Sequence, residues 1–187
     1  ESIANDYKSL YGIPKPVLIF NAPYPATIEK KDTFREIFHI PREDKIFIYQ
    51  GALCKGRGLE TILKAFNDSQ LKQSHIVFMG YGPLESEIKK AATSHSNIHF
   101  KDAVPMEQIM DFTSSADFGL CLIENSCKSY DYCLPNKLFE YVLAGLPVVA
   151  SNLTELTKFI SDNPIGITVN IDNTQKLAEE LIKVSKK

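Results

Sequence analysis

Residues 134–151 combine features that suit the binding of a phosphorylated ligand. Their pattern predicts a helix that begins near Asn136, a turn at Gly145 and a buried strand over 147–150. The first turn of a helix carries free N–H groups and the positive end of the helix dipole, and both favour phosphate. Glu140 lies one turn into this helix, where its carboxylate can accept hydrogen bonds from a diol such as a ribose. A phosphate site beside a diol site predicts a nucleotide ligand.

A second candidate is the glycine-rich segment 51–58, which reads Gly-Ala-Leu-Cys-Lys-Gly-Arg-Gly. It separates an expected strand from an expected helix. Glycines let the backbone approach a ligand closely, and the cations Lys55 and Arg57 suit a diphosphate. The segment is not a P-loop, because Arg57 stands where that motif needs lysine. The alternative interpretation is a solvated basic turn.

The elements that must position these residues alternate along the chain. Strands are expected at 45–50, 75–79, 97–100, 118–123, 147–150 and 166–169. Helices are expected at 2–11, 58–67, 84–92, 106–114, 136–144, 154–160 and 174–184. The strands are continuous apolar runs, which are typical of a sheet covered on both faces. The pattern predicts an α/β fold with a doubly wound parallel sheet of the Rossmann-like kind.

Ligands of such sheets bind beyond the carboxyl ends of the strands, near the switch in strand order. The loops to consider are therefore 51–57, 80–83, 101–105, 124–135 and 151–154.

The segment 134–151 resembles the donor-binding signature of retaining GT-B glycosyltransferases, family four and its relatives, the glycosyl transferases group 1. In that family the segment reads roughly Pro-x-Lys-Leu-x-Glu-Tyr-x-Ala-x-Gly-x-Pro-Val-Val-Ala, and Glu140, Gly145 and 147–150 match it. The resemblance covers almost the whole chain but only half of such an enzyme. It implies that residues 1–25 are the linker and entry elements from an absent N-terminal domain. Residues 26–187 would then be the nucleotide-sugar-binding domain.

The resemblance also implies roles for individual residues. Contacts to the donor diphosphate are expected from Gly51, Lys55, Arg57, Asn136, Lys137 and Leu138. Glu140 would bind the ribose, and backbone groups near Val104 would bracket the nucleobase. The family's arginine position in the first loop holds Ala52, so Lys55 or Lys137 is left to supply the missing charge.

A second departure concerns the family's Glu-x₇-Glu pair. Glu140 is the second member, but Tyr132 stands at the position of the first. The family associates that first glutamate with the transferred sugar, so Tyr132 is the candidate at the donor sugar, and neither Asp131 nor Glu124 fits the spacing. No catalytic residue is identified from the sequence.

The implied reaction transfers a sugar from a nucleoside diphosphate sugar to a glycan or lipid acceptor, with retention. The acceptor would bind through the missing N-terminal domain, and the chain alone is expected to bind nucleotide without activity. No metal or other cofactor is expected, and bacterial polysaccharide biosynthesis is the expected setting. Three alternatives stay open: a nucleotide-sugar epimerase of GT-B architecture, a non-catalytic nucleotide-binding domain and a dinucleotide-dependent oxidoreductase. The last would need a Gly-x-Gly-x-x-Gly fingerprint, but Glu85 stands where the third glycine after Gly80 and Gly82 belongs.

Composition narrows the class further. The formal net charge of −2 over 187 residues argues against nucleic acid as the main partner. No run reaches the roughly 18 apolar residues that a membrane helix needs, so we expect no transmembrane segment. The four cysteines form no Cys-x-x-Cys pair, which predicts reduced thiols and a cytoplasmic protein. Any association with the inner face of the membrane would come from the missing domain. The four histidines form no plausible metal trio with Asp or Glu.

Overall fold

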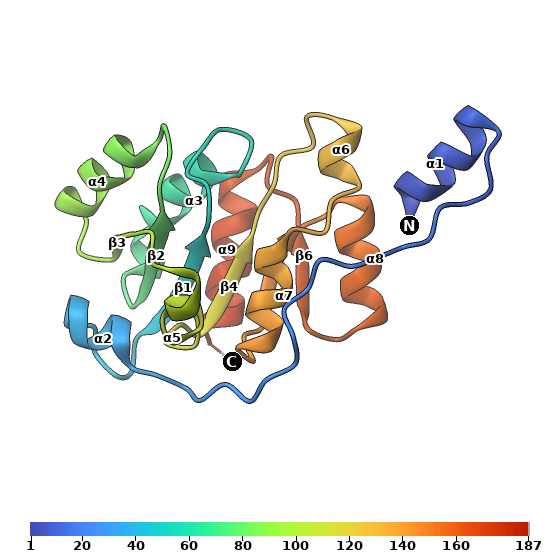
Figure 1. The fold of residues 1–187 in the computed structure, drawn as a ribbon. Helices are drawn as coiled ribbons and strands as arrows, with labels where there is room; N and C mark the ends of the chain where they lie inside the picture. The colour runs from blue at the N-terminus through green and yellow to red at the C-terminus, as the bar shows by residue number, and fades with distance from the viewer. Residues whose placement is uncertain (187) are drawn as a thin grey trace.

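The computed structural model describes residues 1–186 and confirms the predicted Rossmann-like α/β fold (Figure 1). Six parallel strands form one sheet in the order β3-β2-β1-β4-β5-β6. The strands are β1 (Lys45–Gln50), β2 (Ser74–Gly80), β3 (Ile98–Asp102), β4 (Phe118–Cys121), β5 (Val148–Ser151) and β6 (Gly166–Val169). The direction of winding reverses between β1 and β4, and a ligand cleft is expected at that point.

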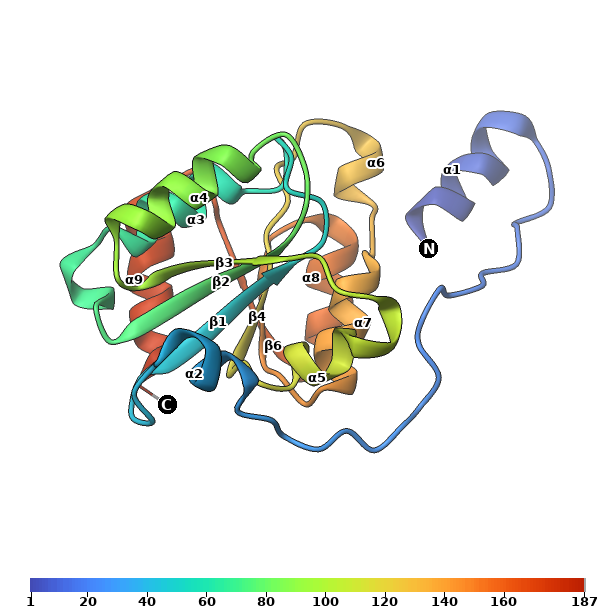
Figure 2. The same cartoon turned by 60° about the vertical axis from the view of Figure 1, so that its left-hand side comes forward.

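Helices cover both faces of the sheet, as Figure 2 shows. One face packs against α3 (Leu59–Phe66), α4 (Glu85–Ser94) and α9 (Thr174–Ser185). The other packs against α2 (Thr33–Phe38), α5 (Ile109–Thr113), α7 (Asn136–Leu143) and α8 (Thr154–Asp162). Phe47 and Tyr49 of β1 belong to the first cluster, and Ile46 and Ile48 to the second. Successive residues of β1 thus face opposite layers, which explains why the strand is a continuous apolar run.

The bounds of the predicted helices and strands agree with the structure to within two or three residues. The short elements α2, η1 (Ser69–Leu71) and α6 (Lys128–Asp131) were not expected, because segments of three to six residues show no measurable period. The helix expected at 106–114 is divided into η2 (Met106–Gln108) and α5. The strand expected at 118–123 ends at Cys121.

The N-terminal segment lies outside the sheet. The helix α1 (Ser2–Tyr11) forms as predicted, and residues 12–32 continue without helix or strand along α8 and α7 to α2 (Figure 1). The side chain of Asn21 donates to Asn136 Oδ1 at 3.1 Å. Phe20 packs edge-on against Phe139, with ring centroids 6.2 Å apart. This segment therefore passes the first turn of α7.

Within residues 1–186, no helix combines the length and the hydropathy that a membrane span requires. The cysteines at positions 54, 121, 127 and 133 are all free thiols.

Candidate functional site

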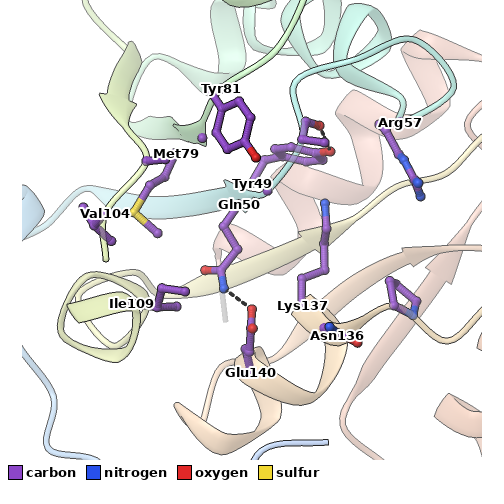
Figure 3. Close-up of a pocket in the computed structure, with 15 residues that line it drawn as sticks. Tyr49, Gln50, Arg57, Met79, Tyr81, Val104, Ile109, Asn136, Lys137 and Glu140 are labelled. Atoms are coloured by element: carbon purple, nitrogen blue, oxygen red, sulfur yellow. Dashed lines mark hydrogen bonds between the residues drawn. The ribbon is translucent and has the colours of Figure 1, made fainter. Parts of the chain in front are cut away.

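A cleft of about 440 Å³ opens at the carboxyl ends of β1 and β2, on the α5 and α7 side of the sheet (Figure 3). Its walls come from the loops at 51–57, 80–83 and 101–105 and from the segment where the loop 124–135 joins α7. The lining residues are Tyr49, Gln50, Gly51, Ala52, Arg57, Met79, Gly80, Tyr81, Ala103, Val104, Ile109, Pro135, Asn136, Lys137 and Glu140. The cleft thus lies where the change in strand order predicts a ligand site.

The helix α7 is fixed to the sheet by Tyr141, which is fully buried. The hydroxyl of Tyr141 accepts a hydrogen bond from the backbone N–H of Gln50 at 3.1 Å and lies 3.3 Å from the carbonyl oxygen of Ile48. Its ring lies against β4 at Gly119, where a Cβ atom would stand only 2.3 Å from the ring carbons. Glycine at that position therefore lets α7 approach the sheet closely enough to line the cleft.

One end of the cleft is cationic. Lys137, in the first turn of α7, places its Nζ atom 3.6 Å from the centroid of the Tyr49 ring. Burial, reinforced by the charge of Arg57, lowers the pKa of the Lys137 ammonium to about 8. The guanidinium of Arg57 lies 4.8 Å from the centroid of the Tyr130 ring, a cation–π contact. Two positive groups thus meet at the place where the sequence predicts a diphosphate.

The N-terminus of α7 adds hydrogen-bond donors at the same end. Its N-cap residue, Pro135, makes no side-chain capping bond. The backbone N–H of Leu138 donates to the carbonyl oxygen of Pro135 at 3.0 Å. Among the hydrogen bonds of residues 1–186, none takes the amide protons of Asn136 and Lys137. These two amides can therefore serve an anionic ligand.

Glu140 stands between the cationic end and an apolar end (Figure 3). Its Oε2 atom accepts a hydrogen bond from Nε2 of Gln50 at 2.5 Å, and Gln50 Oε1 in turn lies 2.7 Å from Thr113 Oγ1. The carboxylate is partly buried, and it lines the cleft. It is thus held in place by a buried polar side chain while it faces the ligand space.

The opposite end of the cleft is apolar. It is formed by Met79, Val104 and Ile109, with Tyr81 at the rim (Figure 3). Met79 is 3% exposed, whereas Tyr81 is 72% exposed. The backbone is tightly packed here, because a Cβ atom at Gly80 would stand 1.9 Å from the carbonyl oxygen of Gly51. An apolar slot with an exposed aromatic side chain at its rim suits a flat, partly apolar ring.

The structure brings most of the predicted site residues to this cleft. Those that line it are Gly51, Arg57, Val104, Asn136, Lys137 and Glu140. Lys55 does not line it, and its side chain is exposed. Leu138 is fully buried in the core, and its amide donates to the carbonyl oxygen of Pro135, so a diphosphate contact through Leu138 stays a prediction that its surroundings do not favour.

Tyr132, predicted to lie at the donor sugar, also lies outside the lining of the cleft. The reason is the unexpected helix α6, which ends at Asp131. Asp131 accepts hydrogen bonds from the backbone N–H and the hydroxyl of Thr154, at 2.9 and 2.8 Å. This contact ties the end of α6 to the start of α8. The centroid of the Tyr132 ring lies 5.9 Å from the Nζ atom of Lys128.

Other lining residues were given no individual role from the sequence. Five of them lie in the loops expected to bind a ligand, namely Ala52, Gly80, Tyr81, Ala103 and Pro135, whereas Tyr49, Gln50, Met79 and Ile109 lie outside those loops. Gln50 carried a usable signal, because it is a polar residue at the carboxyl end of an otherwise apolar strand. The others look like ordinary strand and loop residues, and only their place in the fold brings them to the site.

Two of the four histidines, His75 and His99, form a separate group at the other end of the sheet. His75 Nε2 lies 3.0 Å from Asp44 Oδ2, and His75 Nδ1 lies 2.9 Å from His99 Nε2. Burial, with a smaller effect of the neighbouring His75, lowers the pKa of His99 to about 4. Within the described part of the chain, no three His, Cys, Asp or Glu side chains are grouped as metal ligands would be.

Comparison with known proteins identifies the family. A family model described as glycosyl transferases group 1 matches residues 44–187. The putative teichuronic acid biosynthesis glycosyltransferase TuaC of Bacillus subtilis (strain 168) is 22% identical over 184 residues, which are 97% of this chain and 44% of that protein. The chain spans less than half the length of the curated relatives it matches.

Solved structures show the same fold. WaaG, a glycosyltransferase involved in lipopolysaccharide biosynthesis, aligns with a TM-score of 0.65 and 18% identity over 88% of this chain and 43% of that chain. The C-terminal domain of LpcC, a glycosyl transferase group 1 family protein from Francisella tularensis, aligns with a TM-score of 0.63 and 19% identity over 88% and 85%. The predicted half of a GT-B fold is confirmed by these neighbours. Because the family model covers most of its length, the chain belongs to the glycosyl transferases group 1 family.

Proposed function

We propose that this chain is the donor-binding half of a retaining glycosyltransferase and that its cleft holds a nucleoside diphosphate sugar. The observation that supports this most directly is the order of chemistry along the cleft. An apolar slot at Val104 is followed by the carboxylate of Glu140 and then by Lys137 and Arg57. A nucleoside diphosphate presents its base, ribose and phosphates in that same order.

The cationic end of the cleft would act on the leaving group. When the bond to the sugar breaks, negative charge builds up on the departing diphosphate. Lys137, Arg57 and the free amides of Asn136 and Lys137 are fixed before the reaction and would stabilise that charge. We propose that these groups neutralise the diphosphate without a metal ion or other cofactor. Glu140 would orient the donor through its ribose and would take no part in proton transfer.

The acceptor is proposed from the relatives. TuaC is named for teichuronic acid biosynthesis, and WaaG is described as acting in lipopolysaccharide biosynthesis. We therefore propose a glycan or lipid-linked acceptor of a bacterial surface polysaccharide. It would bind to a part of the protein beyond this chain, and the chain alone would bind nucleotide without transferring sugar. Measurable transfer by residues 1–187 alone would contradict this.

Calorimetric titration of the chain with UDP, GDP, ADP and NAD tests the proposal. One nucleoside diphosphate should bind in preference to NAD. The Glu140→Ala variant should bind it roughly 10- to 150-fold more weakly, because charge-assisted hydrogen bonds worth ~1.5–3 kcal/mol are lost. Unchanged affinity of Glu140→Ala would refute the ribose role. If no ligand binds, the same titration on the longer protein decides between a cleft that needs its partner domain and a cleft that binds no nucleotide.

A further inference from the structure

Gln50 is an amide side chain that is buried at the carboxyl end of β1, with 4% of its surface exposed. A buried amide needs hydrogen-bond partners for both its nitrogen and its oxygen. Here Nε2 donates to Glu140 Oε2, and Oε1 lies 2.7 Å from the hydroxyl oxygen of Thr113, which is fully buried. The three side chains form a continuous polar chain from α5 through β1 to the wall of the cleft, and Figure 3 shows its last hydrogen bond, from Gln50 to Glu140.

The direction of each hydrogen bond in this chain is fixed from the Glu140 end. A carboxylate only accepts, so Gln50 must turn its Nε2 toward Glu140. Its Oε1 then faces Thr113, whose single hydroxyl proton is within reach of both Gln50 Oε1 at 2.7 Å and the carbonyl oxygen of Ile109 at 2.8 Å. Donation to Gln50 leaves no buried amide atom without a partner. Thr113 thereby keeps Gln50 in the one orientation that serves Glu140.

We propose that Gln50, oriented by Thr113, is a positioning residue that makes the cleft select ribose over deoxyribose. This inference rests on the proposed function. Gln50 occupies one oxygen of Glu140, which leaves the other oxygen to accept from the sugar hydroxyls of the ligand. Gln50 also lines the cleft, where its second Nε2 hydrogen can meet a hydroxyl oxygen. A site built to pair a hydroxyl rejects an analogue that lacks it, because its own polar atoms are then left without partners.

The test compares affinities within one nucleotide. Calorimetry measures binding of whichever of UDP, GDP and ADP the chain prefers, and of its 2′-deoxy and 3′-deoxy forms. The unmodified chain should prefer the ribonucleotide over at least one deoxy form by roughly 10- to 150-fold. Gln50→Leu and Thr113→Val should reduce that ratio to below about threefold. Thr113→Ser keeps the hydroxyl and should restore the ratio.

A matched control separates positioning from simple loss of a buried hydrogen bond. Asn97 is another buried amide, 7% exposed, whose Nδ2 donates to the carbonyl oxygens of Phe66 and Leu71. Asn97→Ala should lower the melting temperature while it leaves the ribose-to-deoxyribose ratio unchanged. A changed ratio in Asn97→Ala would mean that general loosening explains the effect, and the role of Gln50 would be overturned.

The outcomes distinguish this inference from the function on which it rests. If the ratio disappears in Glu140→Ala but survives in Gln50→Leu and Thr113→Val, the positioning role is overturned and the donor site stands. If Gln50→Leu does not fold, the Thr113→Val and Thr113→Ser pair alone decides. If no nucleoside diphosphate binds to the chain or to the longer protein, the proposed function falls, and this inference falls with it.

Discussion

The ammonium of Lys137 should make nucleotide binding depend on pH in the range from 7 to 9. Burial lowers the pKa of this group to about 8 in the free protein, and only its protonated form pairs with a diphosphate. The charged fraction therefore falls from about nine-tenths at pH 7 to about one-tenth at pH 9. A bound diphosphate raises the pKa of Lys137 again, so affinity is nearly full at pH 7 and declines as the pH rises through 8. The unmodified chain should bind about tenfold more weakly at pH 9 than at pH 7, which corresponds to ~1.4 kcal/mol.

Two variants make the prediction specific to Lys137. Lys137→Gln should bind ~10- to 150-fold more weakly at pH 7 and should lose the pH dependence, because no titrating charge remains. Lys137→Arg should keep most of the affinity and also lose the pH dependence, because a guanidinium stays charged at pH 9. Calorimetry at pH 7, 8 and 9 gives the affinities. In these experiments the nucleoside diphosphate is the one chosen by the titration of UDP, GDP and ADP.

Other ionisable groups near the cleft could also make binding depend on pH, and each is accounted for. Burial raises the pKa of Tyr49 well above its ordinary range and that of Cys121 to about 12, so both stay neutral at pH 9. The partly buried thiol of Cys54 is removed by Cys54→Ser. Equal affinity at pH 7 and pH 9 would refute the low pKa of Lys137. A tenfold decline that persists in Lys137→Gln would assign the titration to another group.

Two further predictions concern stability. Because burial lowers the pKa of His99 to about 4, the unfolded chain binds the extra proton first on acidification, and the free energy of unfolding should fall between about pH 6.5 and pH 4. After a discount for the partial exposure of His99, urea unfolding should give a free energy of unfolding about 1–2 kcal/mol lower at pH 4.5 than at pH 7. His99→Phe should make the free energy of unfolding depend less steeply on pH. An equally steep dependence in the variant would show that His99 does not cause the loss. Gly119→Ala would place a Cβ atom 2.3 Å from the Tyr141 ring and should cost ~1–3 kcal/mol in urea unfolding, whereas an unchanged midpoint would show that the ring moves aside freely.

Much of the site could be predicted because it depends on rules that are local or general. Lys137 and Glu140 are three residues apart on a helix, so they share one face, and both line the cleft. The same period places Leu138 one step further around the helix, toward the sheet, where it is fully buried. The side chain of Leu138 therefore faces the core and not the cleft. A match to a family motif by position does not specify which face of the helix a residue occupies.

Other parts depend on contacts that no local pattern encodes. The expectation for Tyr132 assumed that a spacing of eight residues keeps its meaning across the loop 124–135. That loop instead contains α6, and Asp131 is held by Thr154 from the start of α8. Two segments that are 23 residues apart in sequence thus decide where Tyr132 points. A spacing rule can be carried from one protein to another only where the intervening backbone is also the same.

Tyr49 connects Ala52, where the chain departs from the family pattern, with Lys137 at the cationic end. Its hydroxyl donates to the carbonyl oxygen of Ala52 at 2.8 Å and so fixes the backbone at the position where the resembled family has arginine. The face of its ring lies 3.6 Å from Nζ of Lys137. One buried aromatic residue thus fixes the loop at Ala52 and also contacts Lys137, which we propose as the source of the missing charge. The ring attracts the ammonium by a cation–π contact, whereas burial against the same ring weakens its protonation. Under the proposed function, the missing charge is supplied by Lys137, whose pKa is lowered to about 8, whereas an arginine would stay charged.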